Sequence, residues 1–149
     1  MRLDGQTVVD APVERLWEVL NDVELLRKHM PGCESLTEVG PGAYEAVLSI
    51  GVAAIKGRYT AKLHMVDADP PHGYTLCVEG SGKPGFVKGE GQVRLAPTEG
   101  GTELTYSGDL QIGGMIARVG QRLISGLAQR MTRQFFDELA AEAGGAVTP

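Results

Sequence analysis

The sequence predicts an α+β fold in which one curved, seven-stranded antiparallel sheet surrounds a long C-terminal helix, with two short helices after the first strand. Three patterns predict it: an initial strand followed by two short helical segments, alternating apolar and polar residues over positions 33–112, and a helical apolar period from there to about residue 143. The 149 residues suit one domain, 1–143, followed by a frayed tail, 144–149.

The N-terminal segment predicts one strand and two short helices. Residues 2–9 alternate weakly up to Asp10, which suits a helix N-cap, and Pro12 suits the first helical turn, where a missing N–H costs nothing. Four apolar residues then recur at three- and four-residue spacing: Val13, Leu16, Trp17 and Leu20. A second helix is expected over 23–29, because Pro31-Gly32 ends the pattern.

Positions 33–112 predict six strands, each with one apolar and one polar face, as in an antiparallel sheet that is solvated on one side. The clearest apolar faces carry Tyr44, Ala46, Leu48 and Ile50, then Tyr59, Ala61, Leu63 and Met65, then Leu104, Tyr106, Leu110 and Ile112. Turn-forming residues separate the strands at 40–42, 69–71, 80–85 and 99–101.

The last segment predicts one long helix after Gly113-Gly114. Seven apolar residues recur every four positions: Met115, Val119, Leu123, Leu127, Met131, Phe135 and Leu139. A helix of about 28 residues is ~42 Å long, enough to cross the concave face of the sheet. A curved sheet around a single helix does not close its core completely, so we expect a cavity between them.

Apolar residues predicted to face inward are the candidate ligand-binding residues. They are Leu48, Ile50, Tyr59, Leu63, Leu76, Val78, Tyr106, Met115, Ile116, Val119 and Leu123. The alternative is that they form an ordinary core without a cavity. The hydroxyls of Tyr59 and Tyr106 would bond either a ligand or the backbone.

The glycine-rich segment 80–91 lies between two predicted strands, whereas a phosphate-binding loop opens a helix, so we do not expect phosphate binding. We expect a mobile lip at the cavity mouth with Phe86 as an apolar latch, or else a plain turn. Gly113-Gly114 is interpreted as a backbone hinge, which is compatible with a ligand entrance.

Charge and hydropathy exclude several classes of function. A net charge of -5 argues against a nucleic-acid partner, and no run approaches the ~20 apolar residues of a membrane span. The N-terminus shows no apolar secretion signal, so we expect the cytoplasm, with peripheral contact at the inner face of the cell membrane as an option. Three arginines on one side of the long helix form either a solvated face or a membrane or partner contact: Arg118, Arg122 and Arg133.

The pattern offers no catalytic or metal site. His29, His64 and His72 show no ligand spacing, and Cys33 and Cys77 are far apart in the sequence without a CxxC partner. We therefore expect no enzyme activity, no metal and no cofactor.

Several short motifs together resemble the carbon monoxide dehydrogenase G-subunit family, within the START-like (helix-grip, SRPBCC) superfamily of ligand-binding proteins. They are Asp10-Ala11-Pro12 before Leu16-Trp17, Met30-Pro31-Gly32-Cys33-Glu34, Lys56-Gly57-Arg58-Tyr59, Asp69-Pro70-Pro71 with Tyr74, Gly80-Ser81-Gly82, Gly85-Phe86-Val87-Lys88-Gly89, Thr102-Glu103-Leu104-Thr105-Tyr106, Gly113-Gly114-Met115-Ile116-Ala117 and Gly120-Gln121-Arg122. The resemblance implies a helix-grip fold and an accessory role beside a molybdenum-containing dehydrogenase at the membrane. Many members carry a longer C-terminal extension tied to that role, whereas this sequence ends at Pro149.

We therefore expect an accessory protein that carries an apolar small molecule, such as an isoprenoid quinone or a lipid, for a molybdenum-containing dehydrogenase. Two alternatives stay open. One is an assembly or membrane-recruitment factor with no ligand, and the other is a cyclase- or hydrolase-like enzyme of the same superfold.

Overall fold

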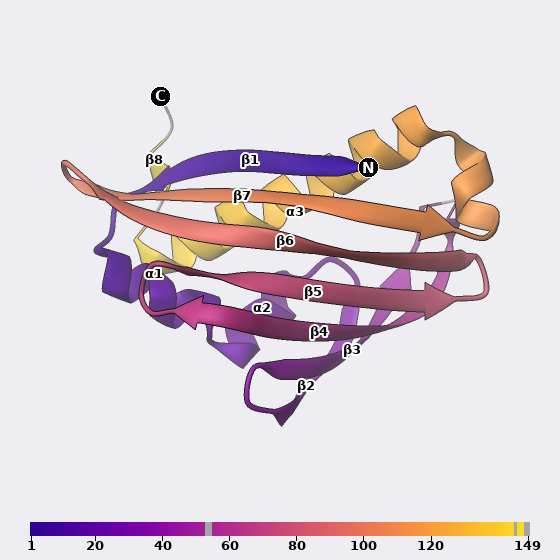
Figure 1. Cartoon of the computed structure of the whole chain (residues 1–149), viewed down its shortest axis with the longest axis horizontal. Helices are drawn as coiled ribbons and strands as arrows, with labels where there is room; N and C mark the ends of the chain where they lie inside the picture. Colours follow the sequence, from indigo (N-terminus) through magenta and orange to yellow (C-terminus); the bar gives the residue numbers. More distant parts are fainter. Residues whose placement is uncertain (53–54, 145, 148–149) are drawn as a thin grey trace.

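The computed structural model describes residues 1–52, 55–144 and 146–147 and confirms an α+β fold with a curved antiparallel sheet around a C-terminal helix (Figure 1). The elements in chain order are β1 (Arg2–Val9), α1 (Val13–Leu20), α2 (Val23–His29), β2 (Cys33–Gly40), β3 (Ala43–Ile50), β4 (Gly57–Asp69), β5 (Gly73–Gly82), β6 (Gly85–Thr98), β7 (Gly101–Gly113), the 3-10 helix η2 (Met115–Val119), α3 (Gln121–Ala143) and β8 (Ala146–Val147).

The sheet has the strand order β2-β3-β4-β5-β6-β7-β1-β8, and every neighbouring pair is antiparallel. The seven predicted strands are all present. An eighth strand of two residues, β8, pairs with Val8 and Val9 of β1, in the segment for which we expected a frayed tail. In Figure 1 the sheet lies in front of α3, and α1 and α2 lie behind the same half of the sheet as the C-terminus.

The helix α1 begins later than Asp10 predicts. Its N-cap is Pro12, whose extended backbone leads directly into Val13, and no side chain caps the helix. The Thr102 hydroxyl of β7 donates a buried 2.8 Å hydrogen bond to the carbonyl of Ala11, and this bond holds the preceding residues in a connection rather than in a helical turn. The prediction of Asp10 as N-cap is therefore wrong.

The predicted 28-residue helix is in fact two elements. The 3-10 helix η2 ends at Val119. The next residue, Gly120, has a φ of +112°, in the region that favours glycine, and this interrupts the regular helical hydrogen bonding. The helix α3 then runs for 23 residues, about 34 Å at 1.5 Å per residue.

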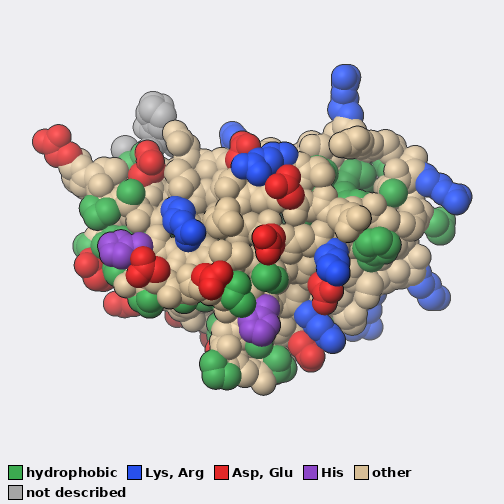
Figure 2. Space-filling view, viewed as in Figure 1, with side chains coloured by type: hydrophobic (Ala, Val, Ile, Leu, Met, Phe, Trp, Pro, Cys, Tyr) green, Lys and Arg blue, Asp and Glu red, His purple; other side chains and the backbone are tan. Residues whose placement is uncertain are grey.

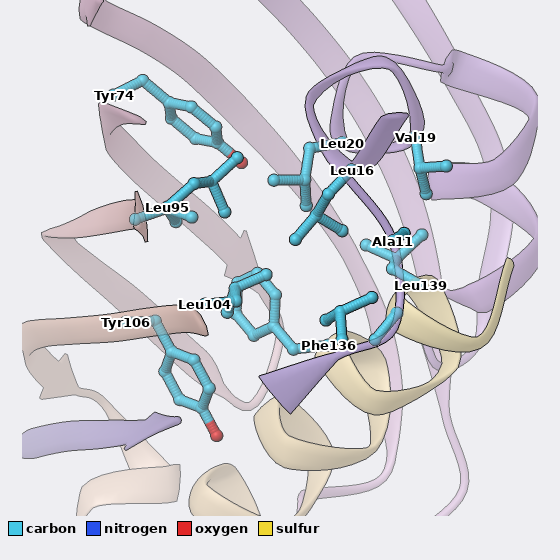
Figure 3. Packing of buried hydrophobic residues seen from close by; sticks show 13 residues of the cluster. Ala11, Leu16, Val19, Leu20, Tyr74, Leu95, Leu104, Tyr106, Phe136 and Leu139 are labelled. Atoms are coloured by element: carbon cyan, nitrogen blue, oxygen red, sulfur yellow. The ribbon is translucent and has the colours of Figure 1, made fainter. Parts of the chain in front are cut away.

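The core fills only one half of the space between α3 and the sheet. Figure 3 shows side chains of α1, α3 and the sheet pointing toward one another in this half. The ring of Tyr106 on β7 stacks on Phe136 of α3 at a centroid distance of 4.5 Å and an interplanar angle of 19°. Trp17 of α1 meets Tyr74 of β5 edge-on at 5.8 Å. Leu139 of α3 is fully buried in the same cluster.

A polar cluster joins α2 to the end of α3. Nε2 of His29 lies 2.9 Å from Oε1 of Glu142, and Nζ of Lys28 lies 3.1 Å from the same oxygen. Nδ1 of His29 lies 3.6 Å from Oε2 of Glu138. The hydrogen bonds from His29 and then Lys28 hold the pKa of the Glu142 carboxyl below its ordinary value.

Two leucines on α3 test how the helix is oriented against the sheet. We expect Leu139→Ala to lower the free energy of unfolding by about 2–5 kcal/mol, because it leaves a cavity in the packed core. Leu123→Ala, on the exposed side, should change it by less than about 0.5 kcal/mol. Urea unfolding of both variants measures the difference, and equal losses would contradict the observed orientation of α3.

The cluster at Glu142 makes stability depend on acid pH. Because its pKa is lower in the folded than in the unfolded chain, Glu142 stabilises the fold above about pH 4.3 and loses this effect as pH falls through the folded pKa. We expect Glu142→Gln to lower the melting temperature at pH 7 and the gap to the wild type to close toward pH 3. Glu99→Gln, in the exposed β6–β7 turn, is the matched control and should show no such gap at any pH.

Candidate functional site

An apolar cavity of about 250 Å³ lies between the first half of α3 and the sheet. Strands β3 to β7, η2, α3 and the first residue of the chain contribute to its wall. The lining residues are Met1, Leu48, Ile50, Ile55, Tyr59, Ala61, Val78, Gly80, Val87, Leu110, Ile112, Ile116, Ile124, Leu127, Ala128 and Met131. Except for the Tyr59 hydroxyl, these side chains carry no oxygen or nitrogen.

Side-chain size explains why the cavity lies at this end. Where α3 meets the packed core, the aromatic rings of Tyr106 and Phe136 fill the space between helix and sheet. About two turns earlier on α3 the corresponding position is Ala128, and the facing strands present Ala61 and Gly80. Small side chains on both surfaces leave a void that neither surface fills.

Tyr59 gives the cavity its one polar side-chain atom, and that atom is already bonded. Its hydroxyl donates to the carbonyl of Ile55 at 2.6 Å, and burial raises the pKa of Tyr59 above its ordinary value, so the group stays protonated at neutral pH. A ligand atom in the cavity would therefore find no free side-chain hydrogen-bond donor among the described lining residues. The described lining side chains therefore present an apolar surface to the cavity, and the α-ammonium of Met1 is bonded to the carbonyl of Leu110.

A second hollow of about 370 Å³ adjoins the cavity and leads to the surface. We call it the mouth hollow; it is lined by Met1, Leu110, Gln111, Ile112, Ala117, Gln121 and Ile124. Four of these residues also line the cavity. The amides of Gln111 and Gln121 make its outer part polar, so the site passes from hydrocarbon inside to hydrogen-bonding groups at the opening.

Five of the twelve predicted ligand-binding residues line the cavity: Leu48, Ile50, Tyr59, Val78 and Ile116. Leu63 and Leu76 are partly buried against the two core clusters, and Tyr106 lies in the packed core. Val119 is half-buried in η2, whereas Phe86, Met115 and Leu123 are exposed. The sequence interpretation missed Met1, Ile55, Ala61, Gly80, Val87, Leu110, Ile112, Ile124, Leu127, Ala128 and Met131.

The four-residue period misplaced Met115 and Leu123. Residues four apart are rotated by 40° on a helix with 100° per residue, so the expected stripe winds around α3 and does not stay on one face. The inward face of α3 follows spacings of three, four and seven residues counted from Ile124, which give Leu127, Ala128 and Met131. Because Gly120 separates η2 from α3, Met115 also has no fixed helical phase relative to Leu123.

The glycine-rich segment 80–91 forms the end of β5, the Lys83-Pro84 turn and the start of β6. The Phe86 ring lies over Gly113, where the absence of a Cβ leaves room for the ring. Gly114, with φ of +82°, turns the chain from β7 into η2, as the hinge interpretation requires. That the lip moves stays a prediction.

The three arginines of the expected contact stripe are exposed but divided between two elements. Arg118 lies in η2, Arg122 in the first turn of α3, and Arg133 half-way along α3. Arg118 and Arg122 flank the residues of the mouth hollow, whereas Arg133 interacts with Tyr106, where it opposes the rise of the tyrosine pKa caused by burial.

The outer face of the sheet is charged and carries a hollow of about 720 Å³. His64, Cys77 and Glu90 are neighbours there across β4, β5 and β6, with Sγ of Cys77 4.0 Å from Oε2 of Glu90. Over the described residues, no group of three or more histidine, cysteine, aspartate or glutamate side chains has a metal-binding arrangement. In the same part of the chain, no helix is long and apolar enough to span a membrane.

Comparison with known proteins identifies the class and then the family. The structure is similar to helix-grip proteins: the Zhui aromatase/cyclase from Streptomyces sp. R1128 has a TM-score of 0.70 at 18% identity, covering 96% of this chain and 93% of that one. Ara h 8.0201 has a TM-score of 0.69 at 14% identity, covering 96% and 97%. These likenesses show the fold.

The model of the CoxG family, the G-subunit family of carbon monoxide dehydrogenase, matches residues 5–144, so the chain belongs to that family. A conserved protein from Geobacillus kaustophilus has a TM-score of 0.91 at 38% identity, covering 96% of this chain and 95% of that one. A search of curated proteins gave no match. The resemblance noted in the sequence motifs is confirmed.

Filling the cavity tests whether the space exists. We expect Ala128→Leu to leave the free energy of unfolding unchanged or to raise it, because the added methylenes enter a void. Ala140→Leu, on the same helix but fully buried in the packed core, should lower it by about 1–3 kcal/mol through overpacking. Urea unfolding of both variants measures these free energies. A loss of stability in Ala128→Leu equal to that in Ala140→Leu would show that the cavity end is packed as tightly as the core end.

Proposed function

We propose that this protein is a carrier that holds the hydrocarbon part of an isoprenoid quinone or a lipid and serves a molybdenum-containing, carbon monoxide dehydrogenase-like enzyme. The observation that carries the proposal is the cavity, which is lined by apolar side chains and opens into a polar mouth. Membership of the CoxG family supports the link to a dehydrogenase.

Volume limits what the cavity accepts. A dry apolar cavity of about 150 Å³ holds one benzene ring, so 250 Å³ has room for a substituted ring or a few isoprenoid carbons, but not for a whole quinone with its tail. An unpaired carbonyl inside would cost free energy, because the Tyr59 hydroxyl is bonded to Ile55. We therefore place hydrocarbon in the cavity and the polar head at the mouth, near Gln111 and Gln121.

The same chemistry supports a non-catalytic role. Tyr59 is the only titratable side chain among the described lining residues, and its hydroxyl is bonded to a backbone carbonyl. The Met1 ammonium, also part of the wall, is bonded to the carbonyl of Leu110. The aromatase/cyclase among the similar structures makes a related enzyme the alternative, which requires polar groups in the cavity.

An assembly or recruitment factor without a ligand is the second candidate. The cavity volume favours it, because 250 Å³ is below the roughly 300–1,000 Å³ typical of small-molecule sites. In this case the surface would carry the function, and filling the cavity would not affect the partner enzyme.

Native mass spectrometry of the gently purified protein tests the carrier function. We expect an additional mass of a few hundred daltons that is released on unfolding and extracted into organic solvent, and we expect Ala128→Leu to lose it. Ala141→Leu, on the exposed side of α3, is the matched control and should keep the ligand. A protein that is empty and also binds no added quinone or fatty acid would favour the assembly factor.

A further inference from the structure

The 3-10 helix η2 lies between the cavity and the mouth hollow. Its Ile116 lines the cavity, and the next residue, Ala117, lines the mouth hollow. Within this fully described element Ile116 is the one buried side chain, at 4% exposure, whereas Met115, Ala117 and Arg118 are exposed. Figure 1 places η2 at the end of the molecule that carries the β5–β6 turn, and in Figure 2 hydrophobic and basic side chains project from that end. On η2, the boundary between the two hollows is therefore a single side chain.

A glycine with a positive φ stands at each end of η2. The φ of Gly114 is +82° and that of Gly120 is +112°, both in the region that other residues rarely adopt. A Cβ at Gly120 would have no neighbouring atom within 4 Å, so the backbone conformation, and not crowding, accounts for glycine there. Because glycine changes φ and ψ at little steric cost, these two positions can act as hinges for the five residues between them.

Few interactions hold η2 in place. Among the backbone hydrogen bonds of the described residues, one joins η2 to a segment distant in the sequence: the amide of Ile116 donates to the carbonyl of Pro84 at 2.8 Å. The Ile116 side chain packs over Gly85, where a Cβ would come within 2.8 Å of its Cγ1. Opening η2 would therefore break one hydrogen bond and expose one isoleucine, which is much less than global unfolding disrupts.

The elements around η2 are held more firmly. Strands β5 and β6 stay paired up to their turn, where Gly82 lies opposite Gly85, and β6 continues the ladder with β7 through Phe86 and Gly113. The helix α3 is fixed by Phe136 in the packed core. Of the segments named here, η2 therefore has the fewest restraints.

The two hollows have a volume that gives such an opening a consequence. The cavity encloses about 250 Å³, below the roughly 300–1,000 Å³ of typical small-molecule sites, and the mouth hollow about 370 Å³. Met1, Leu110, Ile112 and Ile124 line both, so the two spaces adjoin. Withdrawing Ile116 would join them into one site of about 600 Å³, large enough for a ligand that the closed cavity cannot admit.

We propose that η2 is a gate that swings on Gly114 and Gly120, withdraws Ile116 from the cavity wall and joins the cavity to the mouth hollow. The structure shows the gate closed. For its purpose the gate rests on the proposed carrier function, because it would admit and release the ligand. The motion itself needs no ligand, so it is measured on protein without added ligand.

Thiol labelling measures whether η2 opens by itself. Cys33 and Cys77 are free and partly exposed, so the starting protein is Cys33→Ser/Cys77→Ser. In it, Ile116→Cys places a thiol on the gate, and Val93→Cys places one in the packed core. We expect an aromatic disulfide reagent to modify the first thiol at least about tenfold faster, because local opening costs less free energy than global unfolding. Low concentrations of urea should speed Val93→Cys strongly and Ile116→Cys weakly, since the opening exposes little surface.

A pair of glycine variants tests the hinge. A Cβ at Gly120 or at Gly126, within α3, would meet no atom within 4 Å, so the two positions differ in backbone conformation and not in space. Because Gly120→Ala disfavours the φ of +112° found in the closed gate, we expect it to speed the labelling of Ile116→Cys at least about fivefold. Gly126→Ala is the control and should leave that rate unchanged. Equal rates in the two variants would contradict a hinge at Gly120.

Hydrogen exchange checks the same opening without any substitution. The Ile116 amide, which is bonded to Pro84, should exchange at least about tenfold faster than the ladder amides between β6 and β7. The gate is wrong if the Ile116 amide is protected as strongly as that ladder, or if Ile116→Cys and Val93→Cys react at the same rate with the same dependence on urea.

The gate and the carrier function fail separately. A protein whose Ile116→Cys thiol reacts through local opening, but which never carries a ligand in native mass spectrometry, would overturn the carrier function and leave the gate intact. A protein that carries a ligand while this thiol reacts only through global unfolding would overturn the gate alone.

Discussion

The stack of Tyr106 on Phe136 fixes α3 against the sheet, and the rest of the architecture depends on it. Tyr106 can reach Phe136 because its ring lies across Gly5 of the neighbouring strand, where any Cβ would collide with the phenol. Together with Leu139 and the α1 leucines, this stack fills the space between helix and sheet at one end (Figure 3). The helix is thereby held at a fixed distance from the sheet, and small residues farther along cannot close the gap.

The cavity therefore follows from the size of the side chains at the two ends of the helix–sheet interface. Aromatic rings separate helix and sheet at the α1 end, and Ala61, Gly80 and Ala128 fail to fill that separation at the other. The break at Gly120 then turns the chain so that η2 crosses the end of the sheet and Ile116 forms part of the wall. If the chain continued as one straight helix through Gly120, residues 115–119 would extend beyond the sheet and Ile116 would not reach the cavity wall.

The sequence predicted the elements well because their signals are local. Alternation and turn residues placed all seven long strands, and Pro31-Gly32 ended α2 as expected. The cavity was predicted less well, since its position depends on which half of the sheet faces the aromatic rings. That is a tertiary property: Tyr106 and Leu48 show the same alternation, yet one packs in the core and the other lines the void. The sequence signal for the position of the cavity was the presence of small residues, Ala128 and Gly80, at inward-facing positions.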